Sequence, residues 1–106
     1  MHFNTLDELL AALPGLAQEH QAELHGRSAL FLLETKQGRR VFIRLQDGAV
    51  TIAESGEAPV CTVVADENDL LNMMAGKLNP AKALMFGKVK VKGNPKPLLE
   101  LIGLLK

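Results

Sequence analysis

Two Gly-Lys pairs are the residues of this chain whose types and spacing come nearest to a chemical site. They lie at Gly76-Lys77 and Gly87-Lys88. Loops that hold nucleotide phosphates end in Gly-Lys, but a Ser or Thr that binds Mg²⁺ must follow. Leu78 and Val89 follow here. We therefore interpret both glycines as helix ends, where glycine adopts the left-handed conformation at little cost, and we expect no nucleotide site.

The other side chains capable of catalysis or metal binding are scattered. His20 and His25 would lie about 140° apart on a straight helix, and the His-Glu-x-x-His order of zinc proteases is absent. Ser28 and Ser55 belong to no nucleophile motif. Cys61, the sole cysteine, is expected to be a small core residue. We expect no catalytic residue, no metal and no cofactor, and hence not an enzyme.

The lysines are concentrated in the last third of the chain. From Lys77 onward there are seven lysines and one acid, a charge of +6, so residues 1–76 carry −6. Lys88, Lys90 and Lys92 alternate with valines, which fits either a solvated strand face or contact with an anionic membrane surface or CoA phosphates. Nucleic acid is disfavoured, because the chain has four Phe and no Tyr or Trp to stack on bases.

Length and composition place these residues in one small domain. The chain has 106 residues, 47% of them hydrophobic, which predicts a single domain over 1–106 with one core. One cysteine rules out an internal disulfide. Asp7 and Glu8 interrupt the apolar N-terminal segment, and no run approaches the roughly 20 apolar residues of a membrane span. We expect a soluble, cytoplasmic protein.

The first two-thirds of the chain predict a helix and then four strands. Thr5 and Glu8 form a capping box that begins the helix, and Pro14-Gly15 should bend or interrupt it. Strands are predicted over 29–35, 40–46, 49–53 and 60–65, with Asp47-Gly48 as a hairpin turn. We interpret them as a four-stranded antiparallel meander.

The last third predicts two short helices, a strand and a final helix. Asp66 and Asn79 are helix N-caps, the latter followed by Pro80. Residues 88–92 alternate as a half-buried strand, and the last helix runs to about Leu105. Its apolar surface is wider than one-sided packing requires, since Leu99 and Leu104 lie outside the main apolar arc. Such a helix could line a cavity, pack against another copy, rest on a membrane or lie deep in the core.

The strongest motif resemblance lies between residues 60 and 94. Ala65-Asp66 with Asp69-Leu70, then Gly76-Lys77-x-Asn79-Pro80, then Gly87-Lys88-x-Lys90-x-x-Gly93-Asn94, closely resembles the sterol carrier protein 2 family. The resemblance implies an α+β fold with a five-stranded, mostly antiparallel sheet, helices on one face and an apolar cavity between them. It also implies non-catalytic binding or transfer of fatty acyl chains, acyl-CoA, phospholipids or sterol-like molecules.

With this resemblance, the apolar residues of the last third are interpreted as the cavity wall. Flexible methionines suit a surface that accepts varied apolar shapes. The predicted ligand-binding residues are Leu70, Met73, Met74, Leu84, Met85, Phe86, Leu98, Leu101, Ile102 and Leu105. Which of Met85 and Phe86 points inward is left open. The alternative function is an accessory module of lipid or quinone metabolism. Such a module would form a homodimer or dock on a protein through the last helix, with Leu99 and Leu104 facing the partner.

Overall fold

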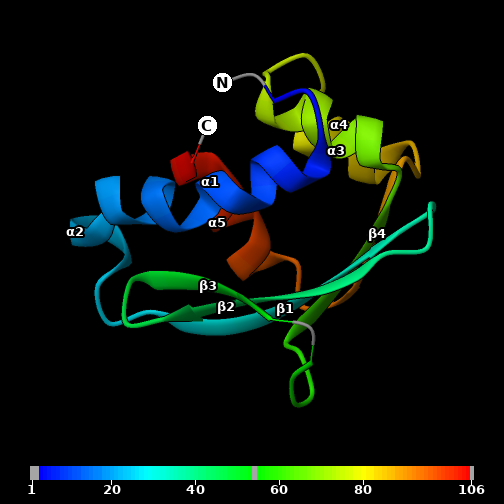
Figure 1. Cartoon of the computed structure of the whole chain (residues 1–106). Helices are drawn as coiled ribbons and strands as arrows, with labels where there is room; N and C mark the ends of the chain where they lie inside the picture. Colours follow the sequence, from blue (N-terminus) through cyan, green and yellow to red (C-terminus); the bar gives the residue numbers. More distant parts are fainter. Residues whose placement is uncertain (1–2, 54, 106) are drawn as a thin grey trace.

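A computed structural model describes the backbone of residues 3–53 and 55–105, and the side chains of these residues up to 103. The chain forms one five-stranded sheet with helices on one of its faces (Figure 1). In chain order the elements are α1 (Leu6–Glu19), α2 (Gln21–Leu24), β1 (Ser28–Thr35), β2 (Arg40–Gln46), β3 (Ala49–Ala53), β4 (Cys61–Ala65), α3 (Glu67–Met74), α4 (Pro80–Met85), β5 (Val89–Gly93) and α5 (Lys96–Leu105). This arrangement confirms the predicted α+β class.

The first helix begins where the capping box predicts. The Thr5 hydroxyl accepts a hydrogen bond from the Glu8 backbone N–H, and Glu8 Oε2 accepts one from the Thr5 N–H. The prediction that Pro14-Gly15 interrupts this helix is wrong, because α1 continues to Glu19. Pro14 and Gly15 are exposed, whereas Leu13 and Leu16 on the other side are buried. Burial of this continuous apolar face therefore stabilises the helix on both sides of the proline.

The sheet order is β3-β2-β1-β4-β5, which corrects the predicted meander. β1, β2 and β3 do form an antiparallel meander, but β4 pairs in parallel with β1 on its other side, and β5 pairs antiparallel with β4. β1 is a nearly continuous apolar run, which is typical of a strand buried on both faces. A central place in the sheet, between two neighbours, satisfies that pattern.

The connection from β3 to β4 passes over the sheet face that the helices leave free (Figure 1). A Cβ added to Gly56 would lie 2.9 Å from Phe42 Cδ1 and 3.1 Å from Leu30 Cδ2, so the loop packs directly on these side chains. Leu30 is buried although it does not belong to the main core. The loop thus covers the apolar side chains that β1 directs away from the helices.

The remaining turns follow the local sequence signals. Asp47 and Gly48 both have positive φ (48° and 85°), as a two-residue hairpin of this kind requires. The Asp66 and Asn79 side chains cap α3 and α4. Gly76 and Gly87 follow these helices with φ of 79° and 75°. The Gly-Lys pairs are therefore helix ends, as predicted.

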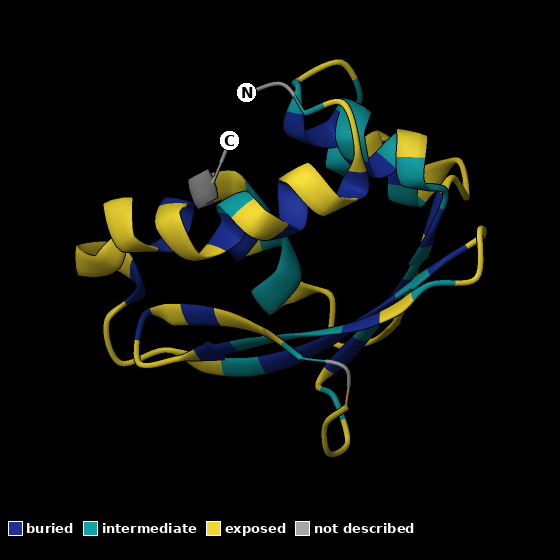
Figure 2. Cartoon of the chain, viewed as in Figure 1, coloured by how far each residue is buried: buried dark blue, intermediate teal, exposed yellow. Residues whose placement is uncertain are grey.

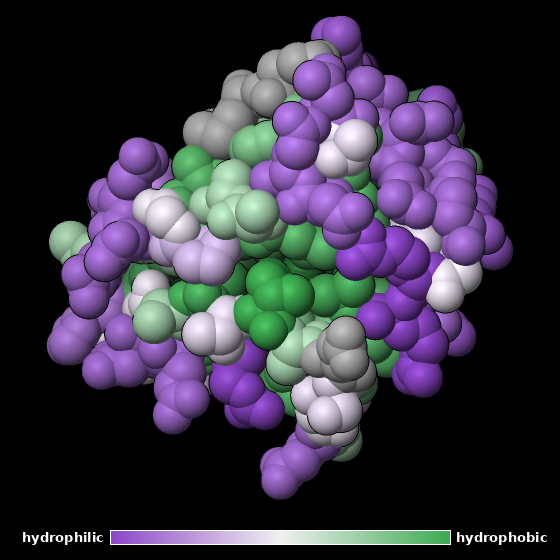
Figure 3. Space-filling model, viewed as in Figure 1, coloured by the Kyte–Doolittle hydropathy of each residue, from purple (hydrophilic) through white to green (hydrophobic). Residues whose placement is uncertain are grey.

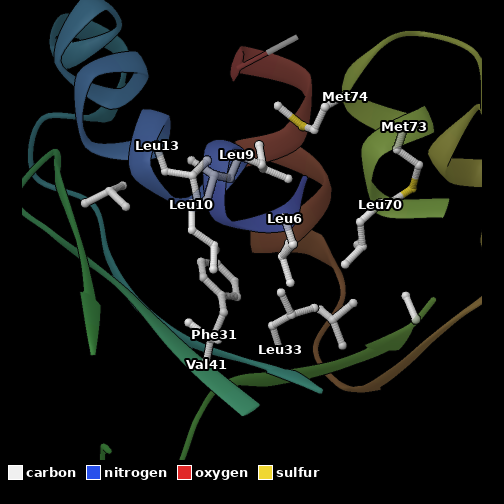
Figure 4. Close-up of a cluster of buried hydrophobic side chains, with 14 of the residues drawn as sticks. Leu6, Leu9, Leu10, Leu13, Phe31, Leu33, Val41, Leu70, Met73 and Met74 are labelled. Atoms are coloured by element: carbon white, nitrogen blue, oxygen red, sulfur yellow. The ribbon is translucent and has the colours of Figure 1, made fainter. Parts of the chain in front are cut away.

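The core lies between the helices and the sheet. Figure 2 shows the buried residues on the inner side of α1 and along the middle of the sheet. In Figure 4, Leu10 points from α1 toward Phe31 of β1, and Leu6 and Leu70 point toward Leu33. None of the helices in the described part of the chain combines the length and the apolar character that a membrane crossing requires.

Candidate functional site

An apolar hollow of about 100 Å³ lies within this core. Its lining comes from α1 (Leu9, Leu10, Leu13), the sheet (Phe31, Leu33, Ile43, Val50, Val63, Val89, Val91), α3 (Leu70, Met73, Met74), α4 (Pro80, Leu84) and α5 (Leu98, Leu99, Leu101, Ile102). Leu32 also borders it, but alternation along β1 directs its side chain to the opposite face of the sheet, with Leu30. Every lining side chain is a hydrocarbon or a thioether. Among the described residues, the hollow therefore offers no charged group and no hydrogen-bonding side chain to an occupant.

Helix periodicity directs the two methionines of α3 into the hollow. Asp66 starts α3, with its Oδ1 accepting from the Asn68 N–H at 2.8 Å, and Leu70, Met73 and Met74 then fall on one face. All three are buried and line the hollow. Figure 4 shows their side chains on the side of α3 that faces α1 and the sheet.

Helix α5 closes the hollow incompletely. Leu101 is buried, but Leu98, Leu99 and Ile102 are only half-buried, although all of them line the hollow. α5 is therefore drawn largely in the intermediate colour in Figure 2. In Figure 3 apolar side chains remain visible in the middle of the molecule, between polar rims. The hollow thus has a partly open apolar border.

Seven of the ten predicted wall residues line this hollow: Leu70, Met73, Met74, Leu84, Leu98, Leu101 and Ile102. Met85 and Phe86 do not, and their exposed fractions are 77% and 70%. α4 is short, and its inward side is already taken by Pro80, Ala83 and Leu84, so the last two side chains project into solvent. The side chains of Leu104 and Leu105 lie outside the described residues.

Sequence reasoning missed the contributions of α1, of the sheet and of Leu99. The leucines of α1 have the helical spacing that indicates a buried face, and this signal could have placed them on the wall. Leu99 was expected to face a partner if the chain is an interaction module, but its side chain borders the hollow. Leu99 is half-buried there, so the partner interpretation stays untested.

A second, more open groove of about 280 Å³ lies beside α5 and is partly polar. Leu24, Arg27, Ser28, Ala29, Leu45, Pro97, Glu100 and Leu101 line it. Arg27 Nη1 lies 2.7 Å from Glu100 Oε2, so an ion pair joins α5 to the segment before β1. The groove is larger than the hollow but opens to water. The hollow is less open and lined by apolar residues, and it is therefore the better candidate for a lipid chain.

The described residues offer little to chemistry other than apolar burial. No group of three or more His, Cys, Asp or Glu side chains among them is arranged to hold a metal ion. Every buried side-chain N or O atom in residues 3–53 and 55–103 has a hydrogen-bond partner. Cys61 is buried, which raises the pKa of its thiol and leaves less of the reactive thiolate.

Comparison with known proteins identifies the same architecture. The sequence model of the SCP-2 sterol transfer family matches residues 3–106. Sterol carrier protein 2 of Rattus norvegicus is 33% identical over 69 residues, which are 65% of this chain and 11% of that protein. The chain thus spans about a tenth of the length of the curated sterol carrier proteins that it matches.

Solved structures share the fold. The sec-alkylsulfatase Pisa1 from Pseudomonas sp. superposes with a TM-score of 0.76 and 25% identity, over 81% of this chain and 14% of that one. Palmitated SCP2L2 from Aedes aegypti superposes with a TM-score of 0.73 and 17% identity, over 95% and 94% of the two chains. The same fold therefore occurs both as part of a much larger chain and nearly alone.

Proposed function

Because the chain belongs to the SCP-2 sterol transfer family, we propose that it binds an apolar lipid chain in the hollow between sheet and helices, without catalysing a reaction. The single observation that carries this proposal is a wall of apolar side chains, supplied by the sheet and four helices, around one partly open space. The ligand class we propose comprises fatty acyl chains, acyl-CoA, phospholipids and sterol-like molecules. Transfer of the lipid between surfaces would follow from reversible binding.

Apolar burial alone supplies enough free energy for such a ligand. Each buried methylene contributes about 0.8 kcal/mol, so a 16-carbon chain gains roughly 12 kcal/mol before the costs of association. Micromolar affinity needs about 8 kcal/mol. No polar anchor is required, which agrees with the hydrocarbon and thioether lining. The palmitated state of the Aedes aegypti protein, which shares the fold, makes a 16-carbon acyl chain the natural first probe.

The hollow must widen to hold that chain. Its volume is below that of an engineered apolar cavity of about 150 Å³ that binds benzene or xenon, ligands much smaller than a 16-carbon chain. α5 contributes more half-buried residues to the wall than any other element, so it has the least packing to lose. We infer that α5 moves outward when a long chain enters, while the flexible Met73 and Met74 side chains adjust to its shape.

Filling the hollow tests this proposal. Leu99→Trp adds bulk on the α5 wall, so uptake of a fluorescent fatty acid should fall at least severalfold, and native mass spectrometry should show less co-purified lipid. Overpacking of this kind costs about 1–3 kcal/mol, so the fold is checked by circular dichroism. The control is Val60→Trp, at an exposed position outside the lining. A wild-type protein that takes up no fatty acid would contradict the proposal.

Membrane contact through Lys88, Lys90 and Lys92 is a further part of the proposal. These side chains are exposed, and none belongs to an ion pair of the described residues. A lysine close to an anionic membrane contributes about 1 kcal/mol. The alternative is an accessory module that forms a homodimer or docks on another protein through α5. Its homodimer form predicts that sizing chromatography of the lipid-free protein gives a mass above one chain.

A further inference from the structure

The largest apolar side chains that the fold leaves uncovered lie together at the end of α4. Met85 and Phe86 are 77% and 70% exposed, whereas Ile52 and Val60, the other exposed large apolar residues of the described chain, are 37% and 45% exposed. The two residues are adjacent in sequence at the last turn of α4. They form an apolar projection, not part of a covered face.

Positive charge surrounds this projection. Lys82 lies three and four residues before Met85 and Phe86, which places it on the same side of the helix, and the Phe86 N–H donates to the Lys82 carbonyl at 2.9 Å. Lys88 follows after one glycine, and both lysines are exposed. From Lys77 to Leu99 the sequence contains six lysines and no Asp or Glu. A partner surface must therefore be both anionic and able to receive apolar side chains.

The opposite side of α4 is part of the hollow. Pro80 and Leu84 line it, and Ala83 is fully buried against the core. The helix is fixed to the domain on this side, and its N-cap Asn79 accepts hydrogen bonds from the Ala81 and Lys82 N–H groups. A surface that receives Met85 and Phe86 would therefore lie one helix away from the hollow.

These observations together lead us to propose that Met85 and Phe86 insert into the interfacial region of an anionic lipid membrane, with Lys82 and Lys88 on its headgroups. The idea rests on the proposed function, since a membrane is where a lipid carrier meets its ligand. A docked α4 places the hollow next to the acyl chains, so a ligand travels a short path through water. The free energy of membrane binding then has two contributions, one from burial of apolar side chains and one from attraction of lysines to anionic headgroups.

Vesicle binding of single variants tests this surface. Co-sedimentation with phosphatidylcholine vesicles, with and without phosphatidylserine, gives the partition coefficient. Phe86→Ser should weaken partition about tenfold, because a fully buried large apolar side chain is worth about that factor. Phe86→Leu should retain most of the binding. Lys82→Gln should lower the partition coefficient about fivefold on vesicles that contain phosphatidylserine. On neutral vesicles it should leave the partition coefficient unchanged.

The control is Val60→Ser, which removes an exposed apolar side chain far along the sequence from α4 and should bind vesicles as the wild type does. A Phe86→Ser variant that binds as well as the wild type overturns the inference. So does a wild type that self-associates through Phe86 and ignores anionic vesicles, since the projection would then be a protein contact.

Uptake of a fluorescent fatty acid from vesicle-free solution separates this inference from the proposed function. Phe86→Ser should take up the probe like the wild type, because its side chain lies outside the hollow. A protein that binds vesicles through Phe86 but takes up no probe would keep the docking surface and lose the carrier function. A protein that takes up the probe but does not bind vesicles through Phe86 would support the carrier function and contradict the docking surface.

Discussion

Asp66 connects two parts of the chain through one carboxylate. Its Oδ1 caps α3 by accepting from the Asn68 N–H, and its Oδ2 accepts from Gln37 Nε2 at 2.8 Å. Gln37 in turn accepts from the Glu67 N–H, so the β1–β2 turn is held to the start of α3. The hydrogen bond from Gln37, followed by that from the Asn68 N–H, lowers the pKa of Asp66 below its ordinary value.

This lowered pKa makes stability depend on pH on the acid side. A carboxyl whose pKa is lower in the folded state stabilises the fold above its unfolded pKa, and that contribution is lost as the pH falls through the folded value. Wild type should therefore exceed Asp66→Ala in melting temperature at neutral pH, with the gap narrowing in acid. Asp66→Asn keeps an N-cap but has no charge to titrate. If the difference in melting temperature between wild type and Asp66→Ala stayed constant from neutral to acidic pH, the lowered pKa of Asp66 would be contradicted.

Position 93 requires glycine for two reasons, its backbone conformation and the close packing around it. Its φ is +94°, and an added Cβ would lie 2.5 Å from the Val60 carbonyl oxygen, which also accepts from the Asn94 N–H. Gly93→Ala should lower the free energy of unfolding by at least about 1–2 kcal/mol, measured by urea denaturation. Gly103→Ala is the matched control, since nothing lies within 4 Å of the added methyl and a helical alanine should stabilise by roughly 0.5–1 kcal/mol.

At the scale of elements, local signals predicted more than long-range pairing. The capping box of α1, the Asp47-Gly48 hairpin and the cap of α4 at Asn79 are all confirmed, because each depends on a few neighbouring residues. The parallel pairing of β4 with β1 was not predicted. It depends on how the loop around Gly56 crosses the sheet, and no short stretch of sequence specifies that path.

In the candidate site, too, local signals were predictive and long-range arrangement was not. The apolar period of α3 indicated correctly that Leu70, Met73 and Met74 face inward. Periodicity does not tell whether inward side chains meet or leave a space, because that depends on distances between elements. It also fails at Met85 and Phe86, where α4 is too short for a face to be defined. Periodicity alone therefore did not predict the hollow; an apolar cavity was expected only from the family resemblance.

The ion pair between Arg27 and Glu100 should influence how readily α5 opens. Both side chains are about half exposed, so the pair contributes at most about 1 kcal/mol to stability. Glu100→Gln should leave the melting temperature nearly unchanged but speed hydrogen exchange in α5 and the uptake of a fluorescent fatty acid. Asp7→Asn is the control, because it breaks the ion pair that joins Asp7 of α1 to Arg39, in the turn before β2. Equal uptake rates in the two variants would show that the pair does not restrain α5.

On the scale of the whole molecule, the positive charge and the helices that close the hollow lie in the same part of the chain. The later part of the chain holds the positive charge, and the same part supplies α4 and α5, which border the hollow. The sheet and α1 carry most of the fully buried core. The half of the molecule that contains α4 and α5 is thus less closely packed, and if the chain carries a lipid, we expect the ligand to enter there.

A series of saturated fatty acids should show whether the less closely packed half moves. If α5 yields, each added methylene becomes buried and affinity should rise by up to about fourfold per carbon from short chains to long ones. If the hollow keeps its volume of about 100 Å³, affinity should level off after the first few carbons. Displacement of a fluorescent fatty acid measures this directly. Leu99→Trp, which reduces the space, should shift any plateau toward shorter chains, and an unshifted plateau would place the binding site elsewhere.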